Sequence, residues 1–146
     1  MTRLIIAEPP AAYVQRPRLV VDASVLAAAL FAETEFEQAV VWMRGRALCA
    51  PHLVDYEIAN AALNKVRRDS VAASAAASAL DAFAALDLER YAIEAAAVLQ
   101  LAARYGLTAY DASYLWLAAR LKAPLATFDV QLGTAAQKHL GELGEE

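Results

Sequence analysis

The stretch LVVDASVLAAAL, residues 19–30, places one carboxylate, Asp22, at the end of a run of apolar β-branched residues. The first part of this stretch is typical of a short buried strand, and the alanine-rich part after Asp22 is typical of a helix, with Ser24 positioned to cap it. An acid in apolar surroundings is stable only when it is protonated, paired or bound to a cation. The surroundings of Asp22 therefore decide how the chain folds and what it does.

Short apolar strands and helices alternate along the rest of the chain. ALCAP (47–51), LDLERYAI (86–93) and PLAT (124–127) are the further predicted strands. Thr108 is a predicted helix cap, and Gly106 is a predicted helix end. The pattern indicates an α/β domain whose central parallel sheet has four or five short strands flanked by helices. The predicted helices cover about 24–30, 35–44, 52–68, 69–85, 93–105, 108–121 and 130–140.

The chain of 146 residues is long enough for one domain with a single core. We expect an N-terminal extension over residues 1–18, the domain over 19–140 and an acidic C-terminal tail, GELGEE, over 141–146. Within the extension, LIIA (4–7) is a candidate short strand, but the prolines at 9, 10 and 17 prevent regular structure from continuing beyond it.

Composition narrows the class of protein. The net charge of −4 argues against a protein that coats nucleic acid, although a local acidic site could hold cations that in turn hold phosphate. The single cysteine, Cys49, excludes an intrachain disulfide. The longest uncharged stretch, Ser70 to Leu80, is too short to span a bilayer, and no signal peptide is recognisable. We therefore expect a cytoplasmic protein.

The arrangement around Asp22 recurs near the other end of the chain. PLATFDV contains an apolar strand followed by Thr127 and Asp129, and a helix begins next. In open parallel α/β sheets, ligands bind outside the carboxyl ends of the strands, and crossover helices return their N-termini to that edge. Glu57 and Asp111 both lie near predicted helix starts, so four acids are expected at one edge of the sheet.

Helical spacing favours these two acids over their neighbours. Asp111 shares its predicted face with Tyr114 and other apolar residues, so it faces the core. Glu57 aligns with Asn60 at a spacing of three residues, whereas Asp55 points to nearly the opposite side of the helix and is excluded.

Taken singly, each acid is more readily interpreted as a turn, a cap or a partner of a helix dipole. Together, four carboxylates repel one another, and no basic residue lies within the four motifs to neutralise them. His52 and His139 follow no zinc-ligand spacing. An all-oxygen site suits Mg²⁺ or Mn²⁺, and two such ions can promote phosphodiester hydrolysis by water.

Four motifs, VVDASVL, YEIANAAL, YDASYLWLAARL and LATFDVQL, resemble those of PIN-domain ribonucleases, and in particular VapC-type toxins of prokaryotic toxin–antitoxin pairs. The resemblance covers about residues 19–140. It implies that the catalytic, metal-binding residues are Asp22, Glu57, Asp111 and Asp129. It also implies that Ser24, Asn60 and Thr127 orient the carboxylates or water through hydrogen bonds, although capping is an equally good interpretation for these three.

The same resemblance implies a function and partners. It implies a Mg²⁺- or Mn²⁺-dependent endoribonuclease acting on tRNA or rRNA, a homodimer, and an antitoxin protein that covers the active-site groove. The N-terminal extension departs from the family, whose members usually begin close to the first strand.

Two alternatives remain open from the sequence. A phosphatase with an aspartyl nucleophile after the first strand usually has a second acid two residues later, where this chain has Ser24. A non-catalytic PIN-like module that only binds a protein partner is the other alternative, and the intact set of four acids argues against it.

Overall fold

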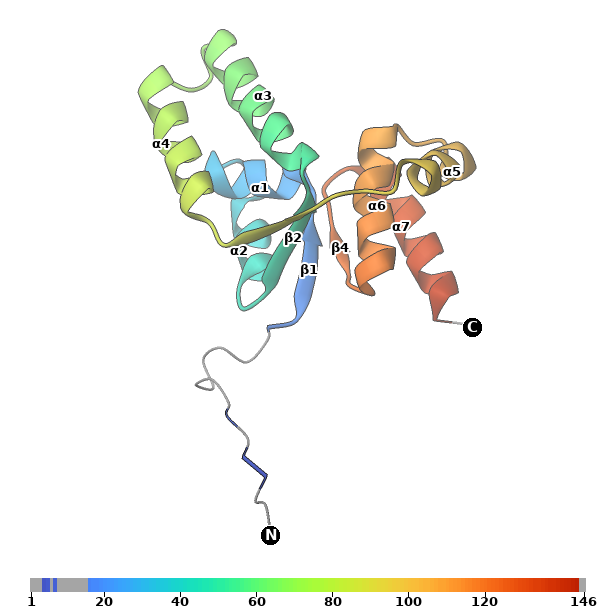
Figure 1. Cartoon of the computed structure of the whole chain (residues 1–146). Coiled ribbons are helices and arrows are strands. Elements are labelled where there is room, and N and C mark those ends of the chain that lie inside the picture. Colours follow the sequence, from blue (N-terminus) through green and yellow to red (C-terminus); the bar gives the residue numbers. More distant parts are fainter. Residues whose placement is uncertain (1–3, 6, 8–15, 145–146) are drawn as a thin grey trace.

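The computed structural model describes residues 4–5, 7 and 16–144. Strands and helices alternate through most of the chain, as the sequence pattern predicts (Figure 1). The strands are β1 (Arg18–Val21), β2 (Ala47–Pro51), β3 (Leu88–Tyr91) and β4 (Leu125–Ala126). The helices are α1 (Ala23–Leu30), α2 (Phe36–Met43), α3 (Leu53–Arg67), α4 (Ala73–Ala85), α5 (Ala95–Tyr105), α6 (Ala109–Leu121) and α7 (Val130–Leu143).

The four strands form one parallel sheet in the order β3-β2-β1-β4. In the central pairs, Val20 of β1 is in register with Cys49 of β2 on one side and with Leu125 of β4 on the other. The predicted α/β fold with a parallel sheet of four or five strands is therefore confirmed, with four strands in the described residues.

The strand order creates a topological switch point. The chain moves outward from β1 to β2 and β3, and then crosses back over the sheet to place β4 on the other side of β1. Loops that leave β1 and β4 at their carboxyl ends therefore diverge from each other, and the crevice between them is where ligands bind in folds of this type. Asp22 follows β1, and Thr127 follows β4.

Helices cover both faces of the sheet, with α1–α4 on one side and α5–α7 on the other (Figure 1). Leu19, Val20 and Val21 of β1 are fully buried between these layers, which explains the unbroken apolar run of this strand. Tyr114 and Leu115 of α6 are also fully buried. No helix in residues 16–144, the continuous part that the structure describes, has the length and apolar character needed to cross a membrane.

Several element boundaries differ from the sequence prediction. The helix α1 begins directly after Asp22, so Ser24 lies inside its first turn and the prediction that Ser24 caps this helix is wrong. The predicted ends at Thr108 and Gly106 are confirmed: Thr108 Oγ1 accepts from Asp111 N at 3.1 Å, and Gly106 has a left-handed φ of 64°.

At the two termini, the structure also refines the prediction. The helix α7 continues to Leu143, so the first residues of the segment interpreted as a tail are helical. In the candidate strand LIIA, Leu4, Ile5 and Ala7 have no regular secondary structure, and Ile6 lies outside the described residues.

Candidate active site

Asp22 is held by hydroxyl groups from both sides of the switch point. Its side chain is buried, with 5% of the residue exposed. Its Oδ2 atom accepts hydrogen bonds from Ser24 Oγ at 2.7 Å and from Thr127 Oγ1 at 2.8 Å. Two donors therefore stabilise the carboxylate without neutralising its charge, and Asp22 Oδ1 forms no hydrogen bond with the residues that the structure describes.

The two hydroxyl groups also fix the loop that follows β4. Ser24 Oγ accepts from Phe128 N at 3.0 Å, and Thr127 Oγ1 accepts from Asp129 N at 3.0 Å. Each hydroxyl thus donates to Asp22 and accepts from the backbone of the loop that carries Asp129. Ser24 and Thr127 lie where the sequence analysis expects residues that orient the acids.

Glu57 reaches this edge of the sheet from α3 and contacts a residue from the opposite helical layer. Tyr114 Oη, on α6, donates to Glu57 Oε1 at 2.6 Å. Burial raises the pKa of Glu57, and the nearby charges of Asp22 and Asp111 raise it further, against the lowering effect of the Tyr114 hydrogen bond. Burial and the neighbouring Glu57 together raise the pKa of the Tyr114 hydroxyl, which therefore remains a donor.

Sequence analysis missed this role of Tyr114, which it assigned to the apolar face of its helix. The residue is fully buried, as that assignment requires, but its hydroxyl needs a partner there. Tyr114 lies three residues after Asp111 on the same helix. That spacing, combined with a polar tip on a core side chain, is the signal that could have suggested a contact with the acids.

Asp111 is coupled electrostatically to two of the other acids. Burial raises its pKa, and the charges of Asp22 and Asp129 add to this effect, while a hydrogen bond from Thr108 lowers it. Because Glu57 is coupled to Asp22 and Asp111, all four acids predicted from the sequence belong to one electrostatic group.

Asp129 combines two of the roles considered from the sequence. It is the N-cap residue of α7, and its Oδ1 atom accepts from Leu132 N at 2.8 Å. Its charge nevertheless acts on Asp111. Asn60 is exposed on α3, and its side chain has no hydrogen bond within the described part of the chain. A role for Asn60 at the site stays a prediction.

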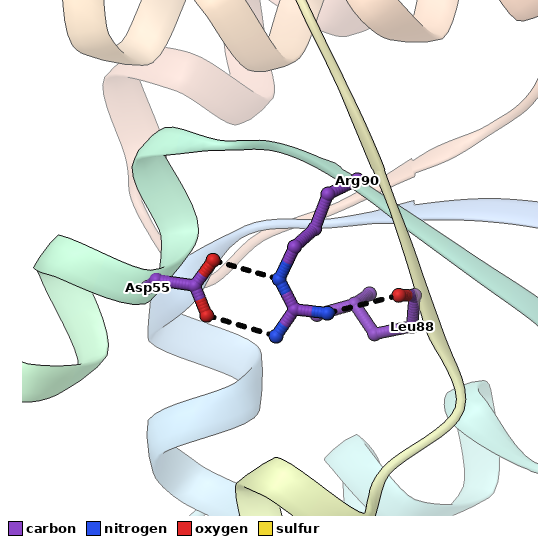
Figure 2. Close-up of polar contacts among 3 residues, drawn as sticks. All are labelled: Asp55, Leu88 and Arg90. Carbon is purple, nitrogen blue, oxygen red and sulfur yellow. Dashed lines mark hydrogen bonds and ion pairs between the residues drawn. The ribbon is translucent and has the colours of Figure 1, made fainter.

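No cationic side chain neutralises the four acids in the described residues, where the ion pairs are Lys65–Glu33, Arg90–Asp55 and Arg104–Glu142. Figure 2 shows the second of these pairs, in which Arg90 donates to both oxygens of Asp55 and to the carbonyl oxygen of Leu88. This ion pair occupies Asp55 away from the four acids, in agreement with its exclusion by helical spacing.

The chemistry of these donors fits a hard divalent cation. The carboxylates are partly desolvated, uncompensated and all oxygen, whereas His139 is engaged with Tyr105 at 3.0 Å. In the described residues, no three His, Cys, Asp or Glu side chains converge closely enough to form a complete ligand set on their own. Mg²⁺ usually keeps several waters and binds through one or two carboxylates, so a loosely spaced group of acids suits it.

Comparison with known proteins agrees with this site and fold. A profile of the PIN domain family matches residues 19–138. The chain belongs to the PIN-domain family. It is 36% identical to VapC ribonuclease Mb0985 of Mycobacterium bovis over 119 residues, which cover 82% of this chain and 91% of the relative. It is 35% identical to ribonuclease VapC3 of Pyrobaculum aerophilum over 120 residues, which cover 79% of this chain and 92% of the relative.

Solved structures show the same fold. The crystal structure of PAE2754 from Pyrobaculum aerophilum matches with a TM-score of 0.66 and 26% identity, covering 93% of this chain and 96% of that one. Mycobacterium tuberculosis VapC20, described as a Sarcin-Ricin loop cleaving toxin, matches with a TM-score of 0.58 at 14% identity, covering 80% of this chain and 94% of that one. The sequence relatives place this PIN domain among the VapC-type ribonucleases.

Proposed function

We propose that this PIN domain is a Mg²⁺- or Mn²⁺-dependent endoribonuclease and the toxin of a toxin–antitoxin pair. The observation that carries the proposal is the group of four mutually coupled carboxylates at the β1–β4 switch point, without a cationic partner among the described residues. Such a group is costly unless cations bind it, and cations bound there would attract the phosphates of RNA.

In this mechanism Asp22, Asp111 and Asp129 bind the cation, and Glu57 either binds it or accepts a proton from the attacking water. A bound divalent ion would supply charge stabilisation at the phosphate and would lower the pKa of water. Ser24 and Thr127 hold Asp22 in place, and Tyr114 holds Glu57. Water attacks phosphorus directly, so no covalent bond forms between enzyme and RNA.

The proposal includes the partners implied by VapC-type relatives. The substrate is RNA, with tRNA or rRNA as the class, and the antitoxin is a protein that covers the site. Exposed apolar side chains on α2 and α3, including Val41 and Tyr56, offer a surface for such a protein. Exposed Leu99 on α5 and Tyr110 on α6 offer a surface for a homodimer. The buried free thiol of Cys49 suits a reducing cytoplasm.

The decisive experiment is RNA cleavage by purified protein in Mn²⁺ and in EDTA. We expect fragments only with the metal, and a loss of roughly 100-fold or more in rate for Asp111→Asn and Glu57→Gln. Asp55→Asn is the matched control, because Asp55 is an acid on the same helix as Glu57 but is paired with Arg90. It should cleave at close to the wild-type rate.

Binding can be measured separately from turnover. Mn²⁺ should raise the midpoint of thermal unfolding of the wild type and of Asp55→Asn, and should have little effect on Asp111→Asn. Fragments that persist in EDTA would contradict the metal mechanism. A protein that binds Mn²⁺ and an antitoxin but leaves RNA intact would favour the non-catalytic module instead.

A further inference from the structure

The strand β4 forms one edge of the sheet and leaves backbone groups available. The carbonyl oxygens of Pro124 and Ala126 accept hydrogen bonds from Val20 N at 2.9 Å and Asp22 N at 3.0 Å in β1. Because successive residues of a strand point to alternate sides, the N–H and C=O groups of Leu125 face away from β1. In the described residues no strand pairs with this side of β4. An edge of this kind is a template for an added strand.

A groove lies beside this edge. Its volume is about 1170 Å³, and it is lined by β4 together with residues of α1, α2, the end of α6 and α7. Apolar side chains dominate its walls, among them Trp42, Leu125, Phe128 and Leu140. Lys122, which immediately precedes Ala123 and Pro124, also lines it and forms no ion pair with the described residues. The groove therefore suits an apolar strand with a negative charge at one end.

The N-terminal segment LIIA followed by Glu8 has this character. Leu4 and Ile5 are 80% and 86% exposed, so two large apolar side chains lie without cover. The isoleucines also favour an extended backbone. The chain thus carries an uncovered apolar strand candidate and an uncovered strand edge.

The connection between the two is long enough. Pro124 is hydrogen-bonded to Val20, so the end of the groove near Lys122 is also the end of the sheet at which β1 begins with Arg18. Residues 8–17 can span roughly 33 Å when extended, at about 3.3 Å per residue. Reaching the far side of β4 from β1 requires about 10 Å, or two strand spacings.

We propose that residues 4–7 dock in the groove as an added edge strand, antiparallel to β4 in the same chain. The antiparallel direction follows from the connection, because Ala7 must lie towards the end where the chain enters β1. This direction also brings Glu8 close to Lys122. The inference concerns the extension and is independent of the proposed nuclease activity.

Disulfide trapping in the full chain tests the position of the segment. In a Cys49→Ala background, a cysteine at Ile5 or Ile6 is combined with Gln137→Cys, since Gln137 is an exposed residue of α7 that lines the groove. We expect an intrachain disulfide, seen as a faster-migrating monomer without reductant. The matched control replaces Gln137→Cys by Gln100→Cys, which places an exposed cysteine on α5 instead. Covalent dimers, or equal trapping in the two pairs, would overturn docking in the same chain.

Tryptophan fluorescence gives a second, equilibrium readout. The chain has two tryptophans, so Trp116→Phe leaves Trp42 in the groove as the reporter. Ile5→Ser should shift Trp42 emission to longer wavelength and increase its quenching by acrylamide. Leu63→Ser, which removes an exposed leucine on α3, should change neither. Identical spectra for the Ile5 and Leu63 variants would show that residues 4–7 do not cover the groove.

Discussion

Replacing Tyr114 by phenylalanine removes the hydroxyl that donates to Glu57 but keeps the ring that fills the core. A hydrogen bond to a charged acceptor contributes about 1.5–3 kcal/mol to stability. Glu57 is only partly buried, so water can replace some of the lost interaction. We therefore expect Tyr114→Phe to lower the free energy of unfolding by about 1.5 kcal/mol.

This value can be converted into a thermal shift. At about 2.1 cal/mol/K per residue, the unfolding entropy of a domain of this size is on the order of 0.27 kcal/mol/K. The expected loss corresponds to roughly 5 °C in the midpoint of thermal unfolding, measured in EDTA so that no cation contributes. We also expect RNA cleavage in Mn²⁺ to fall by about 10-fold, because a residue that orients a metal-binding side chain typically has an effect of that size or larger.

A double-mutant cycle with Glu57→Gln tests whether the hydrogen bond is the cause. If the Tyr114 hydroxyl acts through the Glu57 carboxylate, its removal should cost less in the Glu57→Gln background, with a coupling of about 1 kcal/mol. Strict additivity of the two substitutions, or a Tyr114→Phe protein as stable and as active as the wild type, would refute the reasoning.

Other predictions concern the remaining contacts of the site and its surroundings. Thr127→Val removes one of two donors to Asp22 and should lower the free energy of unfolding by about 1–2 kcal/mol in urea denaturation. Arg90→Ala breaks a partly exposed ion pair, so it should cost only about 0.5–1 kcal/mol and leave RNA cleavage unchanged; lost cleavage would link that pair to the site. The folded-state pKa values of Glu57 and Asp111 are raised, so their contribution to stability is complete below their unfolded values of about 4 and is lost as pH rises through the folded ones. In EDTA, Asp111→Asn should therefore lose less thermal stability than the wild type as the pH is raised over this range, and equal slopes would contradict the coupling.

The sequence predicts the fold well because its signals are local. Apolar β-branched runs mark β1 and β2, and the helix ends at Gly106 and Thr108 follow from residues with specific backbone preferences. The expectation that Asp22 and Asp129 lie at one edge of the sheet follows from the general geometry of parallel sheets, which needs no knowledge of individual contacts.

The contacts that hold the acids could not be predicted in the same way. Ser24 looks like a helix cap by position, but α1 begins one residue earlier, which turns the Ser24 hydroxyl towards Asp22 and the loop after β4. Tyr114 and Glu57 are 57 residues apart, and their contact depends on how two helices from opposite layers meet above the sheet. Such contacts are set by packing and not by local sequence.

The double role of Asp129 has a consequence for how the protein responds to its ligands. One of its oxygens anchors the first turn of α7, while its charge acts on Asp111. A cation that draws this carboxylate inward competes with the amide of Leu132, so the start of α7 loosens or tightens with occupancy. Because α7 also forms a wall of the groove beside β4, loading of the catalytic centre is transmitted to the opposite end of that helix.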